Sequence, residues 1–401
     1  MMRNRLRPCL FLWMWVMSAL CSFSQEVWKG TWATAVEYTG KGDMPKVSLS
    51  NRSCRQVVHV SMGGQVLRLK LSNEFGNDVV EMKSVYIADT DSRCNHLVNL
   101  GTVKYLSFNG KKNVTIEPGS TIYSDPVKYA LKPGQRLTIT IDYGNRTPSN
   151  ATSHRGSRTT SYIVDYLHGK AVKPAYSGFG LQENVDHWYN LSALEVRTRM
   201  ETPVVAILGN SITDGRGSTT NMQNRWTDFL SDALNKEKSF GVLNLGIGGN
   251  CVVEGGLSEP AMKRFDRDIL SQEGVDRLVI FEGTNDIGCS TGNYELVADT
   301  LIACYKVLIQ KAKSKGIKVY GATITPTKGN AWYSVWHEAV RQTVNEWIRN
   351  SGYFDGIIDF DEMTRDISDA QRLKKEYSDD WLHLNPMGYE MMGNYAAEIL
   401  K

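Results

Sequence analysis

The sequence has few cysteines and no arrangement that would place them around a metal. Its 401 residues include seven cysteines, with no C-x-x-C pair and no histidine–cysteine cluster at zinc spacing. Basic and acidic residues nearly balance, at 46 against 43, so the chain lacks the positive excess typical of proteins that bind nucleic acid or anionic membranes. These absences predict a protein with no metal or other cofactor and no nucleic-acid partner.

The most apolar run lies at the start of the chain. Three arginines precede an apolar stretch over residues 9–20, and a small-x-small cleavage pattern ends at Ser24. The pattern predicts a signal peptide over residues 1–24, too short to span a membrane. We therefore expect a secreted or periplasmic protein without membrane insertion after cleavage. A lipoprotein would use Cys21, but the bulky Leu20 before it disfavours that alternative.

Residues 201–401 alternate between short apolar runs and helical patterns. The run Pro203–Leu208 is continuously apolar, as expected of a strand buried on both faces. Apolar residues recur at helical spacing between such runs, for example over residues 226–234. The alternation predicts an α/β domain with a parallel sheet, in which ligands bind at the carboxyl ends of the strands. The further expected strands are 241–245, 278–281, 317–323 and 354–359.

Four polar segments fall where strands of this sheet should end. They are Gly209–Gly215, Asn244–Asn250, Gly283–Asp286 and Asp380–His383. A serine hydroxyl attacks an ester poorly unless an imidazole takes its proton and a third group orients that imidazole. Ser211, His383 and Asp380 can fill these three roles. Asp380 is preferred over its neighbour Asp379 because of its spacing from the histidine.

The same segments offer donors for the negative oxygen of a tetrahedral intermediate. The candidates for this oxyanion hole are the N–H groups of Ser211 and Gly249 and the side-chain amide of Asn285. Each segment alone also fits a plain turn, a helix cap or a surface histidine. A dinucleotide loop is disfavoured because Cys251 stands where the third glycine of G-x-G-x-x-G belongs. The order of the segments and their places at strand ends favour catalysis.

With these motifs the chain resembles the SGNH (GDSL-like) hydrolase family. Position by position, the family pattern assigns the nucleophile to Ser211, the base to His383 and its charge partner to Asp380. Gly249 and Asn285 match the oxyanion donors of the family. The resemblance implies a flavodoxin-like three-layer α/β/α domain and a serine esterase that works through an acyl-enzyme.

The resemblance covers residues 203–401 and departs at one position. Asn210 stands where the family usually has aspartate, a nearly isosteric exchange that removes a charge beside the nucleophile. We interpret this exchange as one that adjusts the activity, and could lower it, without removing a catalytic group. The α/β-hydrolase alternative is disfavoured because its G-x-S-x-G elbow would need glycine where the chain has Thr213.

Residues 25–200 show a different pattern, of short alternating strands separated by glycine, proline and asparagine turns. Gly63-Gly64 between the runs 55–61 and 66–71 predicts a β-hairpin. The whole region predicts an all-β sandwich of jelly-roll type, large enough to bury its own core. The polar stretch over residues 145–160 indicates a long loop.

Three further segments, Gly30–Ala33, Leu71–Gly76 and Arg264–Asp268, resemble a branch of bacterial secreted GDSL-type esterases with two domains. The resemblance thus extends over nearly the whole chain that follows the signal peptide. It implies that the sandwich is an integral partner of the catalytic domain. Whether the sandwich binds a glycan or only walls the cleft stays open.

Five cysteines remain after signal cleavage, and their odd number leaves at least one thiol free in an exported chain. They are Cys54, Cys94, Cys251, Cys289 and Cys304. Cys304 is the expected free thiol because it falls within a helical pattern. Cys251 and Cys289 each follow an oxyanion segment, and those segments should converge, so we expect a disulfide between them as a hypothesis.

The sequence therefore predicts a secreted carboxylic-ester hydrolase, above all an acetylesterase acting on carbohydrate. No long apolar lid is evident, and the stretch Ser218–Asn221 after the nucleophile is polar, which favours a short acyl group on a polar alcohol. A lipase or arylesterase, or a catalytically weak glycan-binding protein, are the alternatives. Trp332, Tyr333 and Trp336 would either stack on a sugar ring or belong to the core.

Overall fold

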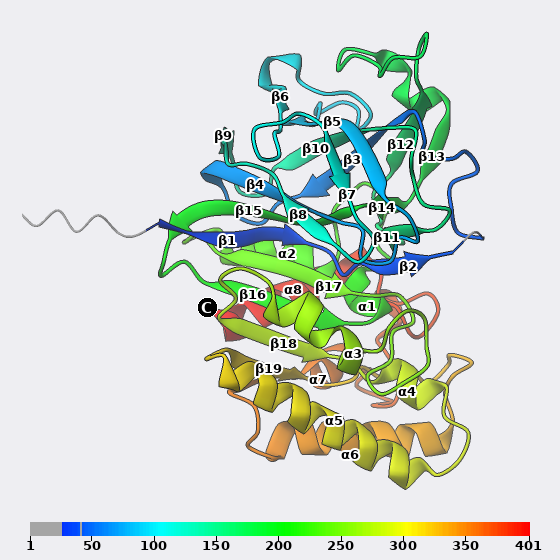
Figure 1. Ribbon diagram of the computed structural model, residues 1–401. Coiled ribbons are helices and arrows are strands. Elements are labelled where there is room, and N and C mark those ends of the chain that lie inside the picture. The colour runs from blue at the N-terminus through cyan, green and yellow to red at the C-terminus, as the bar shows by residue number, and fades with distance from the viewer. Residues whose placement is uncertain (1–25, 41) are drawn as a thin grey trace, which may run out of the picture.

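The computed structural model describes residues 26–40 and 42–401, so the signal peptide expected over residues 1–24 lies outside the described residues. An antiparallel β region over residues 26–200 is followed by a parallel α/β region. Figure 1 shows the antiparallel strands, coloured blue to green, beside the parallel sheet and its helices. The predicted fold class is confirmed.

The parallel sheet has five strands in the order β17-β16-β18-β19-β20. Numbered within this region, the order is 2-1-3-4-5, which is that of flavodoxin-like folds. All four neighbouring pairs are parallel, so the carboxyl ends of the strands lie at one edge. The strands are β16 (Val204–Gly209), β17 (Gly241–Gly246), β18 (Arg277–Phe281), β19 (Lys318–Ala322) and β20 (Gly356–Ile358).

Helices cover both faces of this sheet, which is why its strands are mostly apolar. In β16, Val205 and Ile207 pack in a cluster with the helices α2 and α8, whereas Ala206 and Leu208 pack in the cluster that includes α5 and α6. The helices are α1 (Ser211–Asp214), α2 (Trp226–Leu234), α3 (Ala261–Phe265), α4 (Thr284–Gly288), α5 (Tyr294–Ser314), α6 (Val335–Asn350), α7 (Phe360–Thr364) and α8 (Pro386–Leu400). No helix in the described part of the chain combines the length and apolar character needed to cross a membrane.

The antiparallel region is built from two larger sheets and a small one. The first larger sheet has the order β1-β15-β4-β8, with β9 also on β4, and consists of β1 (Glu26–Ala33), β15 (Leu191–Arg199), β4 (Gly64–Ser72), β8 (Thr121–Tyr123) and β9 (Val127–Leu131). The second has the order β13-β12-β3-β10-β5-β6, with β7 also on β5, and consists of β13 (Glu183–Val185), β12 (Ser161–Asp165), β3 (Arg52–His59), β10 (Arg136–Tyr143), β5 (Val80–Asp89), β6 (Lys104–Tyr105) and β7 (Val114–Ile116). The small sheet has the order β14-β11-β2, from β14 (His187–Tyr189), β11 (Ala151–Arg155) and β2 (Glu37–Thr39). Inward side chains of β4 and β10 share one buried cluster, so the larger sheets pack face to face.

Two expectations for the antiparallel region are wrong. The strands β3 and β4 do not form a hairpin, because β3 pairs with β10 and β12 while β4 pairs with β15, β8 and β9. The glycines between them serve close packing instead: a Cβ on Gly63 would lie 2.5 Å from the Leu131 carbonyl oxygen, and one on Gly64 would lie 2.7 Å from Val196 Cβ. The stretch 145–160 is also not one loop, since it contains β11.

The two regions share one continuous core. Side chains of β1, β4 and β10 belong to the same buried cluster as Leu243 of β17 and Ala206 of β16. Gly30 of β1 leaves room for Leu243, because a Cβ at that glycine would lie 2.9 Å from Leu243 Cδ1. The Val242 N–H donates to the side-chain Oγ of Ser61 at 3.0 Å, and the Gly30 N–H donates to the Glu273 carbonyl at 3.0 Å, so both bonds cross the boundary. The antiparallel region is therefore packed onto the β17 edge of the parallel sheet.

Candidate active site

Ser211 and His383 lie in direct contact at the carboxyl edge of the parallel sheet. Ser211 is the first residue of α1, immediately after β16, and its Oγ lies 2.8 Å from His383 Nε2. On the other side of the ring, Nδ1 lies 2.7 Å from Asp380 Oδ2. With a proton on Nδ1, the imidazole donates to the carboxylate and accepts from the serine hydroxyl. The structure thus brings together the three residues predicted to act as nucleophile, base and orienting acid.

A tight turn explains why a spacing of three residues suffices for Asp380 and His383. The Asp380 Oδ1 atom accepts hydrogen bonds from the backbone N–H groups of Leu382 and His383, at 3.0 and 2.8 Å. Trp381 adopts a left-handed conformation with φ of 62°, which reverses the chain. One carboxylate therefore caps the turn with one oxygen and orients the imidazole with the other.

The other buried histidine, His154, is excluded as the base by its partners. Both of its ring nitrogens face acceptors, the Ala35 carbonyl and Asp214 Oδ1. A ring held between two acceptors donates from both nitrogens and has no lone pair to take a proton. The His383 ring differs because its Nε2 faces a hydroxyl that can donate.

Two of the predicted oxyanion donors, Gly249 and Asn285, belong to segments that contact each other. Among the described residues, no protein acceptor pairs with the N–H of Ser211 or of Gly249. Gly249 has φ of 70°, a conformation that favours glycine. The Asn285 Nδ2 atom donates one hydrogen to the Asn250 carbonyl oxygen at 2.6 Å. The second hydrogen of this amide remains for another acceptor.

The sequence of this region matches a known family. Residues 207–391 match the model of the GDSL-like lipase/acylhydrolase family. This part of the chain belongs to that family. The match includes all the residues of the candidate site, and it makes the parallel region a GDSL-type esterase or acylhydrolase domain.

Solved structures resemble about half of the chain. A GDSL-like lipase from Bacteroides thetaiotaomicron VPI-5482 is 20% identical, with 49% of this chain and 86% of the other covered and a TM-score of 0.38. A carbohydrate acetylesterase family member from Sinorhizobium meliloti is 14% identical, with 49% and 96% covered and a TM-score of 0.39. No curated protein matches the chain.

Asn210, which departs from the usual family residue, keeps a structural role beside the nucleophile. It is the N-cap of α1, and its Oδ1 accepts from the Ile212 N–H at 3.1 Å. Asparagine and aspartate cap helices about equally well. The exchange therefore preserves the turn that presents Ser211 in the GDSL-type domain.

The loop of the GDSL-type domain that carries Gly249, the predicted oxyanion loop, is held by residues whose role sequence reasoning missed. Asp286 follows Asn285, and its carboxylate accepts from the N–H groups of Val252 and Val253 at 2.9–3.0 Å. Burial raises the pKa of Asp286, and these two N–H groups oppose that effect. The Asp286 carboxylate thus ties the loop that carries Gly249 to the segment that carries Asn285.

Arg264 is a second such residue, and it is fully buried behind the site. Its guanidinium donates to the Gly209 carbonyl at 3.1 Å, to the Leu245 carbonyl at 2.8 Å and to Asn250 Oδ1 at 2.9 Å. These acceptors lie at the ends of β16 and β17 and in the oxyanion loop. In the sequence, Arg264 stands out only as the first residue of the segment Arg264–Asp268, which resembles two-domain GDSL-type esterases. Its function here is to hold the strand ends in register.

The antiparallel region reaches the short helix of the nucleophile through Asp214. His154 Nε2 of β11 lies 2.9 Å from Asp214 Oδ1, and Arg158 Nη2 lies 2.9 Å from Asp214 Oδ2. Burial lowers the pKa of His154, but the carboxylates of Asp214 and Glu37 outweigh this effect and raise it overall. A charged imidazole and a guanidinium from one region therefore clamp the carboxylate that ends α1.

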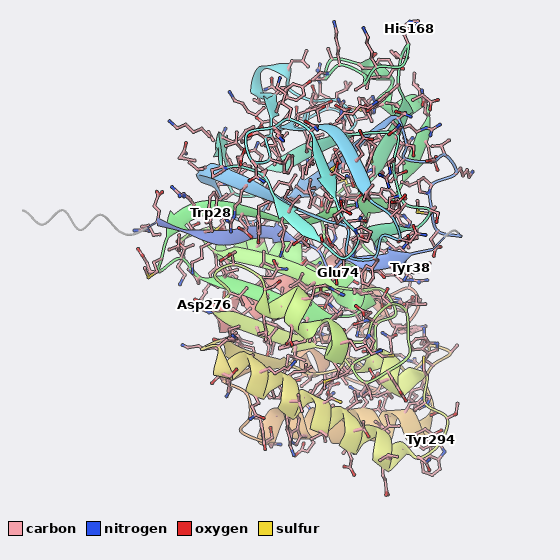
Figure 2. All side chains as sticks on the ribbon, in the orientation of Figure 1. Trp28, Tyr38, Glu74, His168, Asp276 and Tyr294 are labelled. Carbon is pink, nitrogen blue, oxygen red and sulfur yellow. The ribbon has the colours of Figure 1, made fainter. Side chains whose placement is uncertain are left out.

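The aromatic residues that the sequence singles out, Trp332, Tyr333 and Trp336, contact Gly288, Gln371 and Tyr294. Trp336 is 60% exposed and stacks on Tyr294 with ring planes 4° apart, and Figure 2 shows Tyr294 at the end of the parallel half far from the antiparallel strands. Trp332 lies over Gly288, and Tyr333 donates to Gln371. Within the described residues, no three histidine, cysteine, aspartate or glutamate side chains gather in a way that could hold a metal ion.

The expected disulfide is absent. Cys251 is buried and Cys289 is exposed, and both are free thiols. The two loops do converge, but their contact is made by Asp286 and Asn285 rather than by sulfur. Cys304 is free as expected, and so are Cys54 and Cys94.

The environment of His383 predicts the pH range of activity. Burial lowers the pKa of the imidazole; the contact with Asp380 opposes this, and the charges of Arg216 and Arg158 lower the pKa further. Since the ring must be neutral to accept the serine proton, a lowered pKa extends activity towards acid. We expect the acid limb of a kcat/KM–pH profile for an acetate ester to lie below about pH 6.5, the ordinary value. A limb at or above that value would contradict this account.

Proposed function

We propose that the protein is a secreted serine esterase that removes acetyl groups from carbohydrate through an acyl-enzyme intermediate. The observation that carries the proposal is the unbroken contact from Asp380 through His383 to Ser211. In the described part of the chain, the backbone N–H groups of Ser211 and Gly249 have no protein acceptor. A protein that only binds glycans has no need of a base held in this orientation. Membership in the GDSL-like family supports ester chemistry in general.

In the proposed reaction Ser211 Oγ attacks the ester carbonyl while His383 Nε2 takes the hydroxyl proton. The negative oxygen would be bound by the N–H groups of Ser211 and Gly249 and by the Asn285 amide. The imidazolium then gives its proton to the departing alcohol, which leaves the acetyl group on the serine. A water molecule, deprotonated by the same imidazole, releases acetate and restores the enzyme.

The preference for a short acyl group rests on the surroundings of the serine. The segment 218–221 that follows α1 is polar, and the side chains of Thr220 and Asn221 form hydrogen bonds with Asp186 and Thr160. Leu257 is the apolar side chain in contact with Gly249, and a Cβ on that glycine would lie 2.8 Å from Leu257 Cδ1. One leucine offers contact for a methyl group, whereas a long chain would need an apolar tunnel.

A chain-length series of nitrophenyl esters tests this proposal. We expect kcat/KM to be highest for acetate and to fall for hexanoate and octanoate, with release of acetate from acetylated polysaccharide. Each extra CH₂ would add about 0.8 kcal/mol only if it were buried in a tunnel. A steady rise of about fourfold per CH₂ would instead establish a lipid-type pocket and end the carbohydrate proposal. A burst of nitrophenol from the acetate ester would report the acyl-enzyme.

A further inference from the structure

Two arginines lie close to residues of the proposed active site, and neither is used by the proposed reaction. Arg158 comes from the antiparallel region, in the segment between β11 and β12, and its Nη2 lies 2.9 Å from the carboxylate of Asp214, which ends the short helix of Ser211. Arg216 follows that helix, and the next residue, Gly217, packs on the imidazole side, because a Cβ there would lie 3.6 Å from His383 Cβ. Both guanidinium charges also lower the pKa of His383. Gly249 and Asn285 come from other segments, the loop that follows β17 and the helix α4 that follows β18.

Hydrogen bonds to the loop that follows α1 hold the backbone around Arg158, although Arg158 belongs to the antiparallel region. Its carbonyl oxygen accepts from the Asn221 N–H at 2.9 Å, and its neighbour Thr160 donates from its N–H to Asn221 Oδ1 at 2.8 Å. Gln223 donates to Thr159 Oγ1 at 3.1 Å, and Arg225 donates to the Ser157 carbonyl. The backbone at Arg158 also adopts a left-handed conformation with φ of 53°. The segment after β11 is thus fastened to the loop that follows the nucleophile helix.

The guanidinium groups keep donors free for a ligand. Arg158 uses Nη2 for Asp214, its side chain is 26% exposed, and among the described residues no acceptor is bound to its Nη1. Arg216 is exposed, and among the described residues no carboxylate forms an ion pair with its side chain. The acidic groups nearby are already engaged: Asp214 with His154 and Arg158, Asp380 with His383, and Asp186 with two threonine hydroxyls.

The position of the two guanidinium groups relative to Ser211 indicates whether they contact the alcohol half or the acyl half of the ester. The imidazole must reach the oxygen of the departing alcohol in order to protonate it. Groups beside the imidazole therefore contact the alcohol, and groups beyond the oxyanion donors contact the acyl chain. Guanidinium groups bind carboxylate through charge-assisted and often bidentate hydrogen bonds.

We propose that Arg158 and Arg216 bind a carboxylate on the alcohol half of the ester, so that the preferred substrate is the O-acetate of an acidic sugar. This inference rests on the proposed esterase function and narrows it to one class of carbohydrate. It also gives the antiparallel region a direct part in substrate choice, through a residue in the polar stretch 145–160.

A matched pair of substrates tests the inference. The acetylated methyl glycosides of glucuronic acid and of glucose differ only in a carboxylate against a hydroxymethyl group. We expect the ratio of their kcat/KM values to favour the acidic sugar about tenfold in the wild type, the effect of about one charged hydrogen bond. Arg216→Gln and Arg158→Gln should each bring the ratio close to one, and Arg158→Lys should keep part of it. Added salt should lower the wild-type ratio.

The ratio separates binding of the carboxylate from general damage, because a misplaced serine would slow both substrates alike. Arg199→Gln, on the distant end of β15, is the matched control and should leave the ratio unchanged. A wild-type ratio near one, or a ratio that survives both glutamine variants, would overturn the inference while leaving the esterase proposal intact. If the folded wild type released acetate from neither sugar nor from nitrophenyl acetate, both proposals would fall.

Discussion

Replacing Ser211 with alanine is expected to lower kcat for an acetate ester by about 10⁴–10⁶-fold, and replacing His383 with alanine should cost as much. The physical reason is that the 2.8 Å contact between Oγ and Nε2 makes the two side chains one unit. Without the imidazole the hydroxyl stays protonated, and without the hydroxyl the imidazole has no proton to take. Steady-state and single-turnover kinetics with nitrophenyl acetate measure the loss.

The double variant distinguishes a catalytic unit from two independent contacts. If Ser211 and His383 act together, removing both should cost little more than removing one. Losses that multiply would contradict the assignment. Ser314→Ala and His168→Ala, at exposed positions elsewhere, are matched controls that should keep wild-type activity and the same unfolding temperature.

Replacing Asn285 with alanine should lower kcat by about 10²–10³-fold, or roughly 2.7–4 kcal/mol, with little change in KM. An oxyanion donor acts mainly after the carbonyl becomes tetrahedral, so its loss is felt in the transition state rather than in binding. The amide also donates to the Asn250 carbonyl, so the variant removes a contact of the oxyanion loop as well.

Two measurements separate these roles of Asn285. A raised KM with an unchanged kcat would identify the amide as a substrate contact instead. Thermal unfolding of the same variant reports the contact with the Asn250 carbonyl, which we expect to be worth about 1 kcal/mol as a typical hydrogen bond. A stability loss much larger than this would mean that the fall in kcat reflects a disordered loop.

The meeting of Ser211, His383 and Asp380 was predictable because each residue is tied to a local pattern. The apolar run that becomes β16 leads directly into Ser211, and parallel strands end at one edge. The pair Asp380 and His383 is predictable for a similar reason, since one tight turn joins them. Spacing between residues that are close in the sequence was therefore sufficient to predict Ser211, Asp380 and His383.

Contacts between distant segments were not predictable in this way. Arg264 and Asp286 stabilise the site mainly through hydrogen bonds with backbone atoms. Any segment can supply such atoms, so the sequence does not show which backbone groups these two residues bind. The predicted pairing of β3 with β4 was wrong for a related reason. Alternation of apolar residues predicts that a strand exists but does not specify its partner, and Gly63-Gly64 suited close packing as well as a turn. The clamp of His154 on Asp214 likewise joins residues 60 positions apart.

That clamp has a consequence for how this protein can be rearranged by evolution or by engineering. A module that could be exchanged between enzymes would have to leave its neighbour's reactive groups undisturbed. Here the carboxylate three residues after the serine, Asp214, is buried against His154 and Arg158 of the other region. A recombination breakpoint near residue 200 would remove His154 and Arg158 and leave the buried carboxylate of Asp214 unpaired near Ser211. The two regions are therefore expected to be inherited, and to be expressed in active form, only as one piece.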